Sequence, residues 1–382
     1  MMNVLIAPDS FKGSLSSKQV CEAVEEGLLK ASKETFVVLK VPIADGGEGT
    51  VDAFLSAMGG ELVKITVTGP LGDPVSSFYG ILPDGTAVIE MAAASGLNLV
   101  PPSKRNPLLT TTYGTGELIK HALDRGCMRF IIGIGGSATN DAGAGMLEAL
   151  GIRFLDKEGK DVPSCGGELY RVESIVMSNM DPRLRSATFT VACDVDNPLC
   201  GENGASAVYG PQKGADEEMV TLLDQNLSHF ADVVAKTLGK DYRDEPGSGA
   251  AGGLGFALKA FFHAEMRRGI DVVMEVTHMD TLAAKSDIII TGEGRTDCQT
   301  AKFGKAPSGV ANLGKRVGKP VLLISGGLGE GYQELFDQGI VAAFSIANGP
   351  MSLKEAMENA YSLLVDKAQN IGRLLVALTR LS

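Results

Sequence analysis

Acidic residues directly follow several short apolar segments of this 382-residue chain. The segments are VLIAPD, VPIAD, AVIE, TVACD and IIITGE, and their acids are Asp9, Asp45, Glu90, Asp194 and Glu293. Asp141 follows a further apolar run, FIIGI (130–134), after a glycine-rich turn, and Asp297 follows Glu293 in GEGRTD. One acid at a strand end is ordinarily a helix N-cap or a solvated turn residue. Five on separate strands favour a shared ligand, although turn and cap chemistry is an equal alternative for Asp9, Asp45 and the nearby Glu48.

Basic residues lie in loops of the same kind. They are Lys12 in DSFKGS, Lys213 in GPQKGA, Arg295 in GEGRTD and Lys305 in FGKAPSG. Carboxylates bind Mg²⁺ directly or through water, and lysine and arginine contact phosphate oxygens. Acids and bases at one sheet edge therefore suit a metal-bound polyphosphate, and phosphoryl transfer needs this combination.

The stretch RFIIGIGGSATNDAGAG (129–145) gives a competing interpretation. Gly133, Gly135 and Ala138 fit the dinucleotide spacing G-x-G-x-x-A, and Asp156 follows about twenty residues later. This pattern would make the chain an NAD-dependent hydroxy-acid dehydrogenase that uses residues 133–138. Against it, the helix start carries Asn140 and Asp141, which favour a helix cap or groups that face a cleft. A literal G-x-G-x-x-G at 247–252 follows DYRDEP, which is not a strand.

The elements that must position these residues alternate between strands and helices. Strands are expected at 3–7, 36–41, 62–67, 76–82, 86–91, 130–134, 189–193, 287–291, 320–325 and 341–346. A first helix follows the capping box of Ser16 and Gln19, and further helices are expected after Thr50, Gly114, Asp141, Ala215, Gly252, Pro307 and Ser352. This alternation predicts parallel sheets covered by helices on both faces.

The segment from about 62 to 91 departs from this alternation, because three strands follow each other with only turns between them. It therefore belongs to a different, mixed sheet. We expect a discontinuous α/β domain of residues 1–62 plus 275–382, and an inserted α/β domain of residues 63–274.

Composition and missing motifs exclude several classes. The formal charge of −11 argues against nucleic-acid binding. The six cysteines and four histidines show no zinc or disulfide spacing, which indicates reduced thiols in the cytoplasm. The N-terminus lacks the features of a signal peptide, and no apolar run has the length of a membrane span. P-loop, protein-kinase and G-x-S-x-G motifs are also absent.

Taken together, the motifs resemble those of the bacterial type I glycerate kinases, in the order of that family and along essentially the whole chain. They are APDSFKGSLS (7–16), PIADGGEGT (42–50), IEMAAASG (89–96), TTYGTGELI (111–119), IGIGGSATNDAGAGM (132–146), ACDVDNPLCGENGAS (192–206), YGPQKGA (209–215), GAAGGLG (249–255) and TGEGRTDCQTAKFGKAPSGVA (291–311). Ala142, at a position that we associate with glycine in the family, is a minor departure.

The resemblance implies ATP-dependent phosphorylation of D-glycerate to 2-phosphoglycerate, as in the breakdown of glyoxylate, glucarate or galactarate. It also implies a flavodoxin-like discontinuous domain, a second α/β domain and an active site in the cleft between them. A non-enzymatic binder of acids is a third alternative, and the acids at several strand ends argue against it. The sequence leaves open whether C2 or C3 is phosphorylated and whether the chain forms a homo-oligomer.

The expected roles follow from the same resemblance. Asp194 is the first candidate for the base or a metal ligand, and Asp297 is the second candidate for the base. Glu293 is a further candidate metal ligand. Arg295 is expected at the substrate carboxylate, and Lys12 at a phosphate or that carboxylate. The ATP phosphates are expected to contact a larger set: Ser137, Thr139, Asn140, Asp141, Lys213 and Lys305.

Overall fold

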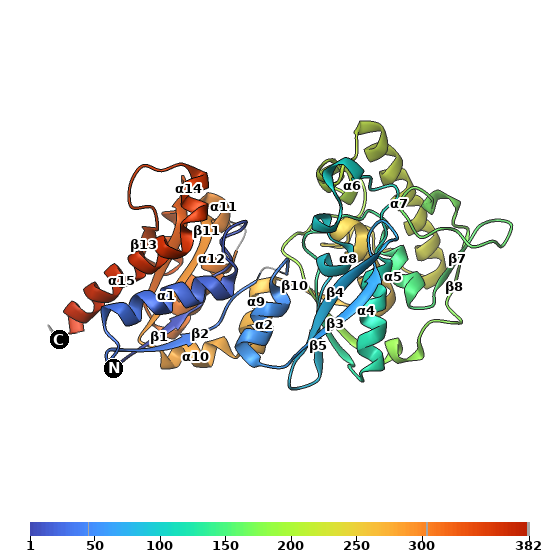
Figure 1. Ribbon diagram of the computed structural model, residues 1–382. Coiled ribbons are helices and arrows are strands. Elements are labelled where there is room, and N and C mark those ends of the chain that lie inside the picture. The colour runs from blue at the N-terminus through green and yellow to red at the C-terminus, as the bar shows by residue number, and fades with distance from the viewer. Residues whose placement is uncertain (45, 303–304, 380–382) are drawn as a thin grey trace. The chain divides into compact units, whose positions relative to one another are not determined.

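Figure 1 shows the computed structural model of the chain, which describes residues 1–44, 46–302 and 305–379. The predicted strand-end acid Asp45 lies outside the described residues. Contacts divide the chain into two compact units. The first unit consists of Met1–Asp45, Asp52–Gly59 and Ile270–Ser382, and the second of Gly46–Val51 and Gly60–Gly269.

The first unit contains a five-stranded, entirely parallel sheet with the strand order β13-β12-β11-β1-β2. Its strands are β1 (Met2–Ile6), β2 (Phe36–Lys40), β11 (Ile288–Thr296), β12 (Val321–Leu328) and β13 (Ile340–Ser345). Numbered within the unit, this is the flavodoxin-like order 2-1-3-4-5, with the second unit inserted between its second and third strands. The expected pairing of N-terminal and C-terminal strands in one parallel sheet is therefore confirmed.

The first unit also contains helices, and several of them contact the central strands β1, β11 and β12. The helices are α1 (Ser17–Ala31), α2 (Thr50–Met58), α9 (Gly269–Val276), α10 (Met279–Lys285), α11 (Cys298–Lys302), α12 (Ala306–Val317), α13 (Glu334–Gln338), α14 (Leu353–Glu358) and α15 (Ala360–Thr379). Helices α1 and α15 lie side by side (Figure 1), and a Cβ at Gly27 would lie 2.4 Å from Val365 O. Their apolar faces join Val4, Ile6 and Ile290 in one buried cluster.

The second unit contains a six-stranded mixed sheet with the order β10-β9-β6-β5-β4-β3. Its strands are β3 (Glu61–Thr68), β4 (Pro74–Ile81), β5 (Thr86–Glu90), β6 (Arg129–Gly133), β9 (Thr188–Ala192) and β10 (Glu265–Arg267). The β3-β4-β5 meander is antiparallel, and β5, β6, β9 and β10 are parallel. The separate mixed sheet expected from residues 62–91 is thus confirmed.

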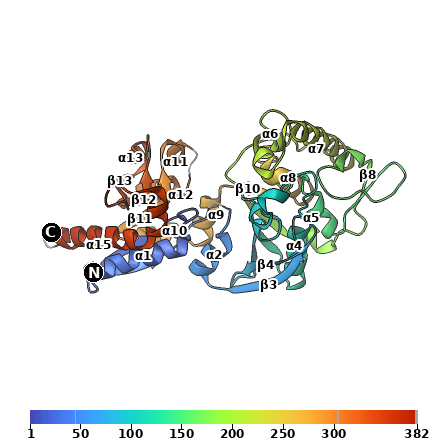
Figure 2. The same ribbon diagram turned by 45° about the horizontal axis from the view of Figure 1, so that its top comes forward.

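The helices of the second unit pack around a large apolar core. They are α3 (Ala92–Ser95), α4 (Tyr113–Asp124), α5 (Ala144–Ala149), α6 (Ala205–Tyr209), α7 (Glu217–Leu238) and α8 (Ala250–Phe262). Figure 2 shows α7 beside α6. Within the core, the rings of Phe130 and Phe189 stack with centroids 4.8 Å apart, and Phe262 stacks on Phe189 at 5.0 Å.

All ten expected strands and the expected helices are present, but three short strands were missed. Two of them, β7 (Arg153–Leu155) and β8 (Ser174–Val176), form a small antiparallel sheet, and β10 is the third. A strand of three residues is too short for its alternation of apolar and polar side chains to be recognised in the sequence. The capping box of α1 is confirmed, because Ser16 Oγ accepts from Gln19 N at 3.2 Å and Gln19 Oε1 accepts from Ser16 N at 2.9 Å.

Candidate functional site

The first unit has a topological switch point between β1 and β11. The chain leaves β1 for β2 on one side, and it leaves β11 for β12 on the other. Open parallel sheets bind their ligands beyond the carboxyl ends of two such strands. The loop after β1 follows the end of β11, since Asp9 N donates to Gly292 O at 2.8 Å and a Cβ at Gly294 would lie 3.2 Å from Lys12 N. The predicted residues of both loops therefore lie at one edge.

Glu293 is a buried carboxyl at this edge. Strand β11 runs on to Thr296 because it pairs with β12 there, so Glu293 lies within the strand and not after it as expected. Its side chain is 7% exposed and accepts a hydrogen bond from Thr300 Oγ1 at 2.6 Å. Burial raises the pKa of this carboxyl above its usual range, and nearby Asp297 adds to the increase, while Thr300 and Lys305 oppose it.

Asp297, which is half-buried, and Arg295, which is exposed, form an ion pair beside Glu293. Asp297 accepts from Gln299 N at 3.0 Å and so caps the start of α11. Arg295 Nε lies 3.3 Å from Asp297 Oδ2, and the arginine side chain is 77% exposed. This pair leaves most of the guanidinium accessible to a ligand.

Two lysines complete the set of charged residues at this edge of the first unit. Lys12 is exposed between β1 and α1, and Lys305 is exposed at the N-cap position of α12. Helix N-termini favour anions because their first N–H groups lack intrahelical partners. The edge of the first unit thus combines the carboxyl groups of Asp9, Glu293 and Asp297 with three cations. This is the composition of a site for a metal-bound polyphosphate.

The second unit presents the carboxyl ends of β5, β6 and β9. Glu90, at the end of β5, is 3% exposed, and its Oε1 accepts from Val51 N at 2.6 Å. It therefore holds the 46–51 segment of the same unit, a role that strand-end position alone did not reveal. Asp194, two residues after the end of β9, is exposed, and its Oδ1 accepts from Gly269 N at 2.9 Å.

Close backbone approach explains the glycines of the stretch after β6. A Cβ at Gly133 would lie 2.4 Å from Gly46 O, and one at Gly135 would lie 2.9 Å from Gly47 Cα. Gly135 N also donates to Gly46 O at 3.0 Å. Residues 46–47 therefore occupy the space that a dinucleotide pyrophosphate would need near these glycines. Ser137 is nearly buried and forms a β-bridge with Gly96.

Asp141 holds this loop together from inside. It is fully buried, and its carboxylate accepts from Thr112 N at 2.7 Å, Thr112 Oγ1 at 2.8 Å, Gly143 N at 3.1 Å and Gly145 N at 3.3 Å. Burial raises the pKa of this carboxyl, and the bonds from Thr112, Gly143 and Gly145 oppose the shift. Asp141 is not the N-cap residue of α5, which is Gly143, but its carboxylate orients the loop before this helix through these four donors.

Lys213 reaches the same loop from the 3₁₀ turn Pro211–Lys213. It is 2% exposed, and its Nζ donates to Thr139 O at 2.6 Å. Burial lowers the pKa of this amine to about 7, against the attraction of Asp141. Thr139 and Asn140 are also fully buried, and Asn140 Nδ2 donates to Ser206 Oγ at 2.9 Å. In this structure the Lys213 amine therefore binds the backbone carbonyl of Thr139 and supports the loop from inside.

The loop carries backbone strain where it meets the kinked start of α8. Ala142 has φ +51° and Ala251 has φ +54°, both in the left-handed region. A Cβ at Gly252 would lie 2.0 Å from Thr139 O, and one at Gly253 would lie 2.6 Å from Ala142 Cα. Such strain is held by surrounding contacts and clusters at functional sites. Ala142, a neutral departure by sequence alone, thus occupies a position that glycine would adopt more easily.

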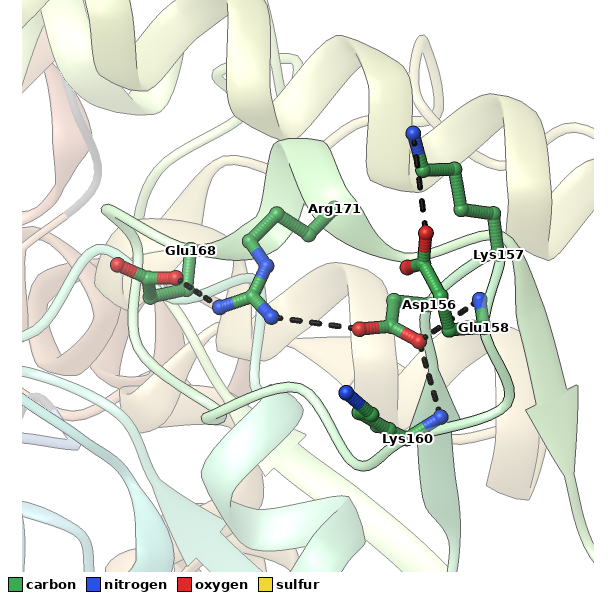
Figure 3. Close-up of polar contacts among 6 residues, drawn as sticks. All are labelled: Asp156, Lys157, Glu158, Lys160, Glu168 and Arg171. Carbon is green, nitrogen blue, oxygen red and sulfur yellow. Dashed lines mark hydrogen bonds and ion pairs between the residues drawn. The ribbon is translucent and has the colours of Figure 1, made fainter.

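Asp156 has no ribose-binding geometry. It follows β7, which forms a separate two-stranded sheet with β8 and lies outside the six-stranded sheet. Figure 3 shows its carboxylate accepting from Glu158 N at 3.0 Å and Lys160 N at 2.9 Å, and pairing with Arg171 at 3.3 Å. The residue stabilises a turn. The structure therefore gives no support to a nicotinamide site at residues 133–138.

The implied Mg²⁺ fits these donors only if the phosphates of the nucleotide supply most of its ligands. Among the described residues, no group of three or more histidine, cysteine, aspartate or glutamate side chains can hold a metal. Kinase sites commonly bind Mg²⁺ through one or two carboxylates and the substrate phosphates. Glu293 with Asp297 in the first unit, or Asp194 in the second, satisfies that smaller requirement.

Sequence patterns did not reveal the residues that support the loops. Thr110 Oγ1 donates to Ala138 O at 2.9 Å, and Thr112 Oγ1 accepts from Met146 N at 2.9 Å. Ser206 binds Asn140, as described above. Thr112 and Ser206 lie in the motifs TTYGTGELI and ACDVDNPLCGENGAS, and this was the only sequence signal for them. Thr110 lies one residue before the first motif and had no such signal.

Comparisons with known proteins cover the whole chain. The family model described as "Glycerate kinase family" matches residues 4–376. The glycerate kinase of Bacillus subtilis (strain 168) is 52% identical over 371 residues, which are 97% of each chain. The glycerate 2-kinase of Escherichia coli (strain K12) is 48% identical over 98% of each chain.

A solved structure agrees with these relatives. A crystal structure described as a glycerate kinase 2 from Salmonella typhimurium LT2 superposes with a TM-score of 0.89, at 48% identity and 99% coverage of both chains. The comparisons likewise give no support to the dehydrogenase alternative. The chain belongs to the glycerate kinase family, a family of ATP-dependent kinases.

Proposed function

We propose that the chain transfers the γ-phosphoryl group of ATP to the C2 hydroxyl of D-glycerate and releases 2-phosphoglycerate and ADP. The observation that carries this proposal is the match to glycerate kinases at about 50% identity over nearly the full chain, including one named glycerate 2-kinase. The charged groups at the carboxyl edges of both sheets suit this chemistry, because phosphoryl transfer depends on positioning and charge neutralisation.

The proposed roles divide by unit. In the second unit, Asp194 accepts the proton of the glycerate hydroxyl while that oxygen attacks the γ-phosphorus and ADP leaves with the bond electrons. In the first unit, Asp297 is the alternative base, and Arg295 is a partner for the glycerate carboxylate because its planar fork matches two oxygens. The exposure of Arg295 and its loose pairing with Asp297 support this role.

The remaining groups act on phosphate. Lys12 and Lys305 are exposed and can neutralise phosphate oxygens directly. Ser137 and the buried residues Thr139, Asn140 and Asp141 would contact phosphate through the loop that they shape, and Lys213 would act through its bond to Thr139 O. When bound, Mg²⁺ would neutralise charge on the phosphates, with Glu293 or Asp194 as protein ligands.

Further parts of the proposal concern organisation and location. We propose that residues 1–62 plus 275–382 and residues 63–274 act as two domains, which the two compact units support. All six cysteines are free thiols, which suits a reducing compartment such as the cytoplasm. Every described helix is too short or too polar to cross a membrane. A homo-oligomer is compatible with these features.

A coupled assay for ADP release tests the activity and the roles together. The wild-type chain should release ADP only when D-glycerate, ATP and Mg²⁺ are all present. Asp194→Asn should lower kcat by about 10²-fold or more, the usual contribution of a general base. Arg295→Ala should raise KM for glycerate. If Asp194→Asn and Asp297→Asn both retain the parental kcat, the base lies elsewhere, and an unchanged KM removes Arg295 from the carboxylate.

A further inference from the structure

Arg105 lies at the carboxyl edge of the six-stranded sheet, in the segment between β5 and α4. It follows the 3₁₀ turn Pro102–Lys104, and the chain after it lies along the loop that follows β6. Its backbone is fixed on the other side by Gly214, where a Cβ would lie only 2.5 Å from Arg105 O. Arg105 thus emerges from a firmly held backbone, next to the turn that carries Lys213.

The guanidinium of Arg105 has an unmet bonding requirement. Its Nε is buried and has no hydrogen-bond partner among the described residues. Other half-buried arginines of the second unit pair with carboxylates: Arg171 with Asp156, Arg183 with Asp181 and Arg243 with Asp232. A buried N–H of a permanently charged group is costly when no acceptor is present. Arg105 carries this cost in a segment that borders the 137–141 loop.

Two further unpartnered polar atoms lie in that loop. Thr139 Oγ1 and Asn140 Oδ1 are buried and make no hydrogen bond in the described part of the chain. Both residues are fully buried, while Arg105 as a whole is partly exposed. Arg105 is therefore the member of this group that solvent and a ligand can reach.

We propose that Arg105 binds anionic oxygens of a reactant, either the carboxylate of the hydroxy acid or a phosphate of ATP. The proposal rests on the proposed kinase function. The planar guanidinium donates two parallel N–H groups to such oxygens. Binding would provide the acceptor that Nε lacks, and it would place the charge of the ligand beside the 137–141 loop. This role was not expected from the sequence, where the segment PPSKRNP carried no recognised motif.

Kinetics of Arg105→Gln and Arg105→Lys test the proposal, with Arg185→Gln as a matched control because Arg185 is an exposed arginine of the same unit. Arg105→Gln should raise KM for one reactant by about 30-fold or more, as expected when a charge-assisted pair is lost. Arg105→Lys should recover only part of this, because it keeps the charge but not the fork. A rise for glycerate identifies the carboxylate, and a rise for ATP identifies a phosphate. Arg185→Gln should leave both values unchanged.

Thermal unfolding separates binding from a structural role and does not depend on turnover. Without ligand, Arg105→Gln should unfold at the wild-type temperature or above it, because it removes a buried N–H that has no acceptor. The increase in unfolding temperature caused by the identified reactant should shrink. The proposal is overturned if Arg105→Gln leaves both KM values and both ligand-induced increases at parental levels, or if it lowers the ligand-free unfolding temperature together with kcat. Failure of the kinase proposal itself would appear earlier, as a wild-type chain without glycerate-dependent ADP release.

Discussion

Replacement of Lys213 by methionine should change how the stability of the protein depends on pH. The amine is 2% exposed, donates to Thr139 O at 2.6 Å and lies near the buried carboxylate of Asp141. Burial lowers its pKa from 10.5 to about 7, so the folded protein holds the proton less tightly than the unfolded chain does. Methionine keeps a similar length and volume but does not titrate.

The size of the effect follows from these two pKa values. Between pH 7 and pH 10.5 the unfolded chain binds more protons, so this lysine makes the free energy of unfolding rise with pH. The penalty of the buried amine is largest below the folded pKa and vanishes above the unfolded one. From about pH 7 to about pH 8.5 the wild type should gain about 2 kcal/mol relative to Lys213→Met, at up to ~1.4 kcal/mol per pH unit.

Urea unfolding of both proteins at several pH values in this range measures the difference directly. The two proteins share all their other titratable groups, so the contribution of those groups cancels in the comparison. Lys236→Met serves as control, because Lys236 is exposed on α7 in the same unit and solvent screens its charge. A gap between wild type and Lys213→Met that stays constant with pH would refute the buried, weakly basic amine.

Three further predictions concern the backbone and the turn. Ala142→Gly should raise the unfolding free energy by up to about 1 kcal/mol, because glycine adopts φ +51° without the left-handed penalty of alanine; a lower unfolding temperature would contradict this. Gly133→Ala should lower the free energy of unfolding in urea by about 1–3 kcal/mol, because its Cβ would lie 2.4 Å from Gly46 O. An unchanged urea midpoint would show that the 46–47 segment moves freely. Asp156→Ala should destabilise by about 1 kcal/mol and leave glycerate-dependent ADP release unchanged, and selective loss of activity would count against its turn role.

Hydrophobic periodicity predicted the elements well because the strands of the two sheets, apart from the short β10, contain apolar runs. Val4–Ile6 and Ile288–Ile290 pair in the parallel sheet as adjacent buried segments, which the sequence shows as VLI and III. The antiparallel meander was recognisable because its turns are short and rich in glycine and proline. The extension of β11 through Glu293 was not recognisable in the sequence, because it depends on pairing with β12 and not on local strand propensity.

The candidate site was predictable in its residue types but not in how each side chain is used. Asp141, Glu90 and Lys213 have the composition of ligand contacts, yet the structure buries all three and bonds them to backbone groups. Burial depends on segments far away in the sequence, such as residues 46–51 for Glu90. Arg105 was missed for the converse reason, since only the fold shows that its Nε lacks an acceptor.

The most direct test of the account is the proton-coupled ³¹P NMR spectrum of the product formed from D-glycerate and ATP. Phosphorylation at C2 joins the phosphorus to a carbon that bears one proton, so the account predicts a doublet that appears together with ADP. A triplet would show transfer to the C3 hydroxyl and would contradict the proposed 2-phosphoglycerate product. A spectrum in which ATP stays intact with D-glycerate and Mg²⁺ present would contradict the kinase function itself.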